Sequence, residues 1–287
     1  MEKRPQRVAA IHDLSGFGRC SLSVILPVLS VMGVQVCPVP TAVLSTHTGG
    51  LGEVVFRDLT DYIAPALAHY KELGIGFEAV YSGFLGSSAQ VDACLSFFRS
   101  YPGALKIVDP VMGDNGKPYR TCTPEMQSRM AELAAVADVI TPNLTEAAIL
   151  LKKGYSYEPL THAAARSLLV KLAELGPNCV VVTGAELATG EIANLGYDRG
   201  NGSFWFVPCD YVPVSYPGCG DIFASVLTGA LLGGASLPIA MSRAAGFVEL
   251  CVKTTFSYGS DARYGVMFES VLPALSQPSA PGNYRTL

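Results

Sequence analysis

Short runs of apolar residues recur along the first two thirds of the chain, and longer amphipathic stretches separate them. Most of these runs are continuous rather than alternating, which is typical of strands that are buried on both faces. The predicted strands cover residues 7–12, 35–44, 78–84, 104–109, 138–141 and 179–183. The predicted helices between them cover residues 20–32, 58–73, 88–100, 124–136, 144–152 and 162–175. This alternation predicts an α/β fold, with a mostly parallel sheet and helices on both of its faces.

The last third of the chain follows a different pattern. Residues 191–198 and 203–208 are rich in β-forming residues and are joined by 199-RGNG-202, which predicts a hairpin at a sheet edge. The residues from about 277 to 287 are expected to be loose. The helices predicted here begin near residue 218, span 237–254 and span 266–275.

Residues 222–241 carry no charged side chain over 20 positions, which is long enough for a membrane span. Gly233 and Gly234 interrupt this stretch, and Pro238 follows at a typical helix start. Arg243 comes soon after, and no belt of aromatic residues marks a membrane interface. We therefore expect two buried helices here rather than a membrane segment.

Composition narrows the class of protein further. The chain has 287 residues, of which 49% are hydrophobic and 15% are charged, so one domain over residues 1–287 with a large core is expected. The net charge of −4 argues against nucleic acid as a partner. The eight cysteines form no CxxC pair, and no apolar signal segment follows the N-terminus, so we expect reduced thiols and a cytoplasmic location.

Polar residues follow nearly every predicted strand of the first two thirds. Ligands of open α/β sheets bind beyond the carboxyl ends of the strands, so these residues are expected to line one crevice. They are His12-Asp13, residues 46–50, residues 82–84, Asp109-Pro110, residues 141–143 and Thr183-Gly184.

The stretch 218-GCGD-221 lies directly before an apolar helix. The first N–H groups of a helix lack partners within the helix and carry partial positive charge, and glycine lets a ligand approach them. Gly218, Cys219 and Gly220 therefore predict an anion site that suits phosphate. Asp221 has two readings, as a capping charge at the helix start or as a base beside the phosphate.

This stretch resembles the signature of the ribokinase superfamily of small-molecule kinases. Four further segments, in the same order as in that family, resemble the pyridoxal (vitamin B6) kinases. They are 45-STHTGG-50, 108-VDPVMGDNGKPY-119, 137-ADVITPNLTEAAIL-150 and 180-VVVTG-184. The resemblance implies a three-layer α/β/α ribokinase-like fold and a homodimer. It also implies ATP-dependent phosphorylation of the 5′-hydroxymethyl group of pyridoxal, pyridoxine or pyridoxamine.

The resemblance also implies roles for the glycine-rich stretch and for the strand ends. Asp221 would accept the hydroxyl proton, while the amides of Gly218, Cys219 and Gly220 would hold the migrating phosphoryl group. Mg²⁺ would bind to Asp109, Asn143 and Glu146, and a monovalent cation such as K⁺ is a further candidate at Thr141 and Thr183. The implied ATP-binding residues are Asp109, Asp114, Asn143, Glu146, Thr183, Gly184, Gly218 and Gly220.

Two of these assignments have simpler readings. Asn143 and Glu146 are three residues apart at a helix start, which is also the spacing of a capping box. Asp114 lies in Gly-Asp-Asn-Gly, where a turn alone would favour an acid.

The implied substrate-binding residues are Asp13, Ser15, His47, Thr48 and Phe84, together with Asp221. Residues 14–18 would form a glycine loop that closes the pocket. Asp13 departs from the serine of many pyridoxal kinases, and Phe84 stands where a tyrosine is common. Cys219 replaces the usual threonine, and a helix start predicts a lowered pKa for its thiol.

Two alternatives remain open at this point. The first is a hydroxymethylpyrimidine kinase of thiamine synthesis, because Asp13 resembles the acid of those enzymes. In a pyridoxal kinase, Asp13 could accept a hydrogen bond from a ring N–H or from the amine of pyridoxamine. A non-catalytic vitamin-binding protein of the same fold is the other alternative, but an intact Asp221 and a complete set of metal ligands argue against it.

Overall fold

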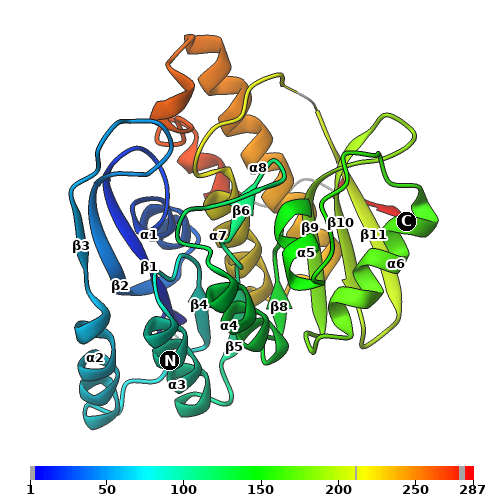
Figure 1. Cartoon of the computed structure of the whole chain (residues 1–287). Coiled ribbons are helices and arrows are strands. Elements are labelled where there is room, and N and C mark those ends of the chain that lie inside the picture. Colours follow the sequence, from blue (N-terminus) through cyan, green and yellow to red (C-terminus); the bar gives the residue numbers. More distant parts are fainter. Residues whose placement is uncertain (1–3, 211, 278–281) are drawn as a thin grey trace.

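A ten-stranded sheet forms the centre of the molecule, as the computed structural model shows for residues 4–210, 212–277 and 282–287 (Figure 1). The strand order is β12-β11-β10-β9-β8-β5-β4-β1-β2-β3. Every neighbouring pair from β9 to β2 in this order is parallel. The parallel strands are β1 (Arg7–Phe17), β2 (Gln35–Thr46), β4 (Ala79–Ser82), β5 (Leu105–Val108), β8 (Val139–Ile140) and β9 (Cys179–Glu186). The predicted mostly parallel α/β fold is confirmed, and the carboxyl ends of these strands lie along one edge.

Antiparallel strands close both ends of the sheet. The predicted hairpin is confirmed as β10 (Ile192–Asp198) and β11 (Ser203–Cys209). Strand β12 (Arg285–Thr286) pairs with β11, and the side chain of Leu287 is buried. The expectation of a loose tail is therefore wrong for the last three residues, because the open edge of β11 offers backbone partners and the core beside it accepts the leucine. At the other end, β3 (Phe56–Asp58) pairs with β2.

Helices cover both faces of the sheet, as the alternation of buried residues along β1 requires. Val8 and Ala10 face one core, which contains residues of α1, α7 and α8, whereas Ala9 and Ile11 face the other. The helices of the first face are α1 (Leu22–Val31), α7 (Cys219–Leu232) and α8 (Leu237–Tyr258). Those of the second are α2 (Thr60–Glu72), α3 (Ser88–Ser100), α4 (Pro124–Ala135), α5 (Leu144–Leu150) and α6 (His162–Ala173).

The uncharged stretch at residues 222–241 is divided between two buried helices. α7 ends at Gly233, and α8 begins after Ser236. None of the helices that the structure describes combines the length and the apolar character that crossing a membrane requires.

Three details differ from expectation. Residues 266–275 do not form an α-helix; the nearby regular structure is limited to 3-10 turns at Ala262–Tyr264 and Leu272–Ser276. Residues 14–17 are no free loop, because β1 continues to Phe17 beside β2 after a register shift between His12 and Leu14, where β2 has one extra residue. A small hairpin of β6 (Gly113–Asp114) and β7 (Lys117–Pro118) was not predicted at all.

Candidate active site

The start of α7 lies at the carboxyl edge of the sheet, where the sequence predicts an anion site. Gly218 has a φ of 87°, and a Cβ built on it would lie 1.8 Å from the carbonyl oxygen of Arg19, so only glycine fits here. No side chain of the described residues caps this helix start. The first N–H groups of the helix therefore remain available for a ligand, with the positive end of the helix dipole behind them.

Asp221 lies in the first turn of α7, and its carboxylate is fixed from the side of β1 and α1. Its Oδ2 accepts a hydrogen bond of 2.7 Å from the backbone N–H of Ser21. Its Oδ1 lies 3.1 Å from Nε2 of His12, which is an ion-pair distance. Asp221 is 9% exposed, so its carboxylate is largely enclosed but borders the crevice.

The side chains of Asp13 and Ser15 are buried and hydrogen-bonded within the protein. Asp13 Oδ1 accepts hydrogen bonds from His12 Nδ1 at 2.9 Å and from Ser21 Oγ at 2.6 Å. Its Oδ2 accepts one from Ser15 Oγ at 3.0 Å. Both oxygens are engaged within the protein and the residue is buried, so the internal bonds of Asp13 compete with its expected contact with a ring or an amine.

His12 carries a positive charge at neutral pH. Burial lowers the pKa of its imidazole, but the charge of Asp221 and the hydrogen bond to Asp13 outweigh burial and raise the pKa to about 10. Burial likewise raises the pKa of Asp13, yet the hydrogen bonds and charge of His12 leave that pKa below its ordinary value. The two side chains form a buried imidazolium–carboxylate pair.

Asp109 and Glu146 are two buried acids that oppose each other's charge. A Cβ built on Gly220 would lie 4.0 Å from Asp109 Oδ2, so Asp109 adjoins the start of α7. Burial, and then the charge of Asp221, raises the pKa of Asp109 to about 7. Burial, and then the charge of Asp109, raises the pKa of Glu146 well above its ordinary value. Such a pair is stabilised by a cation.

These two acids suit Mg²⁺ better than a metal ion whose ligands all come from protein side chains. Within residues 4–210, 212–277 and 282–287, no three His, Cys, Asp or Glu side chains gather as a metal site. Mg²⁺ needs only one or two carboxylates, because water and substrate phosphates supply its other ligands.

Asn143 and Glu146 form the capping box that was the simpler reading of their spacing. Asn143 Oδ1 accepts the N–H of Glu146 at 3.0 Å, and Glu146 Oε2 accepts the N–H of Asn143 at 2.9 Å. The amide of Asn143 also donates to the carbonyl of Gly113, and Glu146 Oε1 accepts the N–H of Met112. Asn143 thus orients Glu146 and fastens the β6–β7 hairpin, and direct metal binding would compete with these bonds.

The other residues assigned to ATP lie at separate places along the edge. Asp114 is exposed, and its carboxylate accepts two hydrogen bonds from Asn115, as the turn reading predicts. Thr183 and Gly184 lie on β9, beside the end of β8. Gly184 has a φ of 63°, and its N–H donates to Asn194 Oδ1.

His47 fastens a loop with both of its ring nitrogens. Nε2 donates to the carbonyl of Arg263 at 2.6 Å, and Nδ1 accepts the N–H of Gly49 at 2.9 Å. A substrate contact by either nitrogen would therefore break an internal bond. Thr48 is exposed beside it, and Phe84 is half-buried at the end of β4, so these two residues remain accessible from the assigned substrate set.

The expectation for Cys219 is wrong. Burial raises the pKa of its thiol to about 12, and the charge of Asp221 adds to this effect. The nearby negative charge and the loss of solvent outweigh the helix start, so Cys219 remains a protonated thiol.

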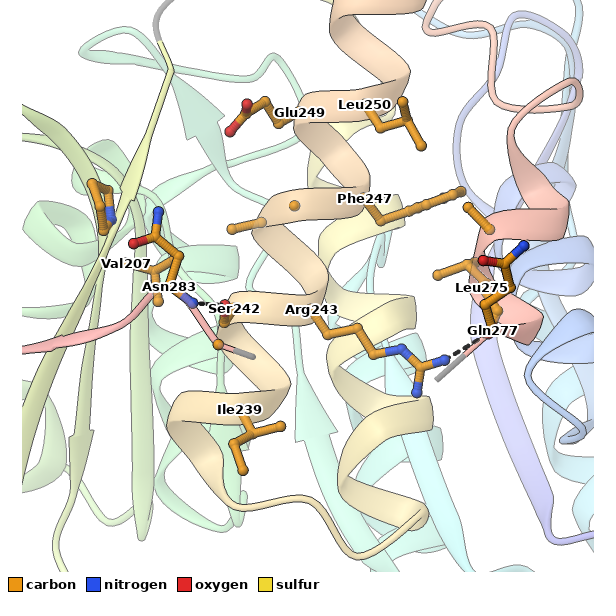
Figure 2. A pocket seen from close by; sticks show the side chains of 15 residues that line it. Val207, Ile239, Ser242, Arg243, Phe247, Glu249, Leu250, Leu275, Gln277 and Asn283 are labelled. Atoms are coloured by element: carbon orange, nitrogen blue, oxygen red, sulfur yellow. Dashed lines mark hydrogen bonds between the residues drawn. The ribbon is translucent and has the colours of Figure 1, made fainter. Parts of the chain in front are cut away.

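A hollow of about 340 Å³ lies along α8, away from the residues assigned to the reaction. Figure 2 shows Val207 and Asn283 on one side of the helix and Leu275 and Gln277 on the other. None of the residues assigned to catalysis, substrate or ATP lines it. The candidate active site is thus the strand-end crevice and not this hollow.

Sequence reasoning missed two residues that contact Asp221. His12 was noted only as a polar residue at a strand end, and Ser21 was not noted. The signal for His12 was an imidazole beside an acid at the end of a buried strand. Nothing in the local sequence around Ser21 points to Asp221, which lies 200 residues further along the chain.

Comparison with known proteins gives one protein family. The profile of the phosphomethylpyrimidine kinase family matches residues 26–265. A pyridoxal kinase of Granulibacter bethesdensis is 31% identical over 251 residues, which are 81% of this chain and 84% of that protein. A hydroxymethylpyrimidine/phosphomethylpyrimidine kinase of Mycobacterium tuberculosis is 25% identical over 258 residues, or 89% and 91% of the two chains.

Two solved structures match nearly the whole chain. A provisionally assigned phosphomethylpyrimidine kinase of Bacteroides thetaiotaomicron, crystallised with pyridoxal, superposes with a TM-score of 0.94 at 41% identity. That match covers 99% of this chain and 100% of the other. The pyridoxal kinase of Lactobacillus plantarum superposes with a TM-score of 0.87 at 31% identity and covers 95% and 97%.

The raised pKa of His12 predicts a pH dependence that can be measured directly. A folded-state pKa above the ordinary 6.5 means that the charged imidazole stabilises the fold fully below pH 6.5, and that this contribution is lost as the pH rises toward 10. With only four histidines, ¹⁵N NMR should resolve the signal, and comparison with His12→Gln assigns it. The imidazolium pattern should persist until the pH approaches 10; titration near 6.5 would contradict the buried ion pair.

Proposed function

The chain belongs to the phosphomethylpyrimidine kinase family, and on that premise we propose that it phosphorylates the 5′-hydroxymethyl group of pyridoxal, pyridoxine or pyridoxamine with ATP. The observation that carries this proposal is the position of Asp221 beside the uncapped start of α7. An anion site and a carboxylate there reach the same small volume. The pyridoxal in the 41% identical structure supports a B6 vitamer as the acceptor.

The residues support a direct transfer. Asp221 accepts the proton of the acceptor hydroxyl while the hydroxyl oxygen forms a bond to the γ-phosphorus of ATP. The bond from that phosphorus to the bridging oxygen breaks, and ADP leaves with the electron pair. The amides of Gly218, Cys219 and Gly220 stabilise the negative charge on the transferred group. The Cys219 side chain takes no part, because only its backbone N–H is needed.

Asp109 is the residue best suited to hold Mg²⁺, with Glu146 behind it. The metal, when bound, neutralises charge on the phosphates of ATP. Asp109 and Glu146 contribute by offering buried negative charge next to the α7 start, which favours a nucleotide that arrives with its cation. A monovalent cation such as K⁺ would use the oxygens of Thr141 and Thr183, which lie at the ends of adjacent strands.

A hydroxymethylpyrimidine is the second candidate acceptor. The matching family profile and the relative in M. tuberculosis favour it. Asp13 supports this alternative only weakly, because both of its oxygens accept hydrogen bonds within the protein.

A homodimer in the cytoplasm completes the proposal. Val43, Val55 and Phe56 are exposed on and beside β2 and β3, where the sheet has an open edge that a second copy can cover. All eight cysteines are free thiols, as in a reducing compartment.

Steady-state kinetics with four acceptors tests the function. We expect transfer to the three B6 vitamers with kcat/KM at least about tenfold above that for hydroxymethylpyrimidine, because a margin of about 1.4 kcal/mol in transition-state binding gives that ratio. ADP formation is measured with and without each acceptor. A large preference for the pyrimidine alcohol would replace the B6 assignment.

Sedimentation velocity tests the assembly. The 30.3 kDa chain should sediment as a species of twice its mass, and Phe56→Lys should shift it toward the monomer by placing a charge in the covered edge. Lys71→Glu on exposed α2 is the matched control. A wild-type monomer at micromolar concentration would rule out a stable dimer.

A further inference from the structure

We infer that His12 is a positioning residue for Asp221 and that Asp13 and Ser21 hold it in place, so that the acid at the end of β1 serves the base rather than the substrate. This inference deepens the proposed phosphoryl transfer and rests on it. Its evidence is a continuous buried chain of contacts from Ser15 to Asp13, His12 and Asp221.

The contact between His12 and Asp13 lies beside an irregular point of the β1–β2 ladder. Consecutive residues of a regular strand point to opposite faces of the sheet, yet the side chains of His12 and Asp13 are hydrogen-bonded to each other. The register between β1 and β2 shifts between His12 and Leu14, where Asp13 of β1 lies opposite two residues of β2, so the ladder is irregular beside Asp13. The hydrogen-bonded pair of His12 and Asp13 therefore departs from the side-chain alternation of a regular strand.

Gly83 makes room for the ring on the opposite side. A Cβ built on Gly83 would lie 1.9 Å from Cδ2 and 2.1 Å from Nε2 of His12. These distances are far below van der Waals contact, so any side chain at this position would displace the imidazole. The ring of Tyr81 meets the imidazole edge-on at 6.4 Å between centroids. These neighbours restrict the position of the imidazole, and in this position Nε2 faces Asp221.

Ser21 provides a second, independent indication that this arrangement is functional. It has a φ of 57° and a ψ of −141°, an unfavourable conformation for a residue with a Cβ. In that conformation its backbone N–H reaches Asp221 and its hydroxyl reaches Asp13. One strained residue thus links both carboxylates of the network.

Nε2 of His12 is a buried polar atom without an aligned hydrogen-bond partner in the described chain, although Asp221 Oδ1 is 3.1 Å away. The ion pairs formed by Asp13 and Asp221 in the described chain both involve His12. A small rotation of Asp221 toward a bound alcohol would align this N–H, as catalytic hydrogen bonds often tighten only in the complex.

The test separates the positioning role from a substrate-binding role. His12→Leu should lower kcat about 100-fold while the KM values for ATP and pyridoxal change less than about threefold, because the lost contact orients the base and not the ligands. His12→Gln, which keeps an N–H donor, should recover about tenfold of that loss. Exposed His69→Gln should match the wild type.

Asp13 distinguishes the two readings most sharply. If Asp13 acts through His12, Asp13→Asn lowers kcat, and the double variant with His12→Leu is no slower than His12→Leu alone within about threefold. If Asp13→Asn instead raises KM for pyridoxamine alone and leaves kcat unchanged, Asp13 binds the amine and the inference is wrong.

A third variant, Gly83→Ala, displaces the imidazole without removing a polar group, so it tests the position of His12 separately from its presence. Gly83→Ala should displace the imidazole and lower kcat about tenfold, whereas Gly103→Ala, whose new methyl meets nothing within 4 Å, should leave kcat unchanged. Thermal unfolding and binding of an ATP analogue show that each variant is folded. Wild-type kcat in folded His12→Leu overturns the inference.

A failure of the proposed kinase function can be distinguished from a failure of the inference about His12 and Asp221. If the wild type phosphorylates none of the four acceptors, the pair is tested by unfolding alone. The losses in Tm caused by His12→Leu and Asp221→Asn should then be clearly non-additive, because the two side chains contact each other. Additive losses would overturn the inference without reference to turnover.

Discussion

The fixed position of the Asp221 carboxylate at the start of α7 is the constraint on which the site depends. The helix brings backbone N–H groups to the sheet edge, but a base can use them only if its oxygens lie at the same place. The close contact between Gly218 and Arg19 sets the helix against the start of α1, and the N–H of Ser21 then fixes the carboxylate. The proposed phosphate site and the proposed base therefore belong to one structural unit.

Charge balance is the second feature of this edge. Asp13, Asp109, Glu146 and Asp221 are all buried, which is unfavourable for four carboxylates without partners. His12 compensates the two acids nearest β1. Burial and the charge of Asp221 raise the pKa of Asp109, and burial and the charge of Asp109 raise the pKa of Glu146, so we propose that these two acids receive a cation that accompanies the nucleotide. The site thus has a permanently paired half and a half that is completed by its ligand.

Local sequence predicted the elements of this fold well and the internal contacts less well. Continuous apolar runs identified the parallel strands, and 199-RGNG-202 identified the hairpin, because both depend on neighbouring residues. The pattern could not show that the β1–β2 ladder is irregular beside Asp13 or that His47 bonds to Arg263, because these features depend on residues far apart in the chain. Asp13 was therefore assigned to the substrate without its bonds to His12, Ser15 and Ser21, while the contacts of His12 and Ser21 with Asp221 were not foreseen.

Kinetics and binding of Asp221→Asn test the central claim most directly. The change keeps the size of the side chain and removes the base, so an ATP analogue and pyridoxal should bind within about threefold of the wild type while kcat falls by about 1,000-fold or more. A variant that binds both ligands and turns over at the wild-type rate would contradict the assignment of Asp221 and, with it, the reading of the α7 start as the site of transfer.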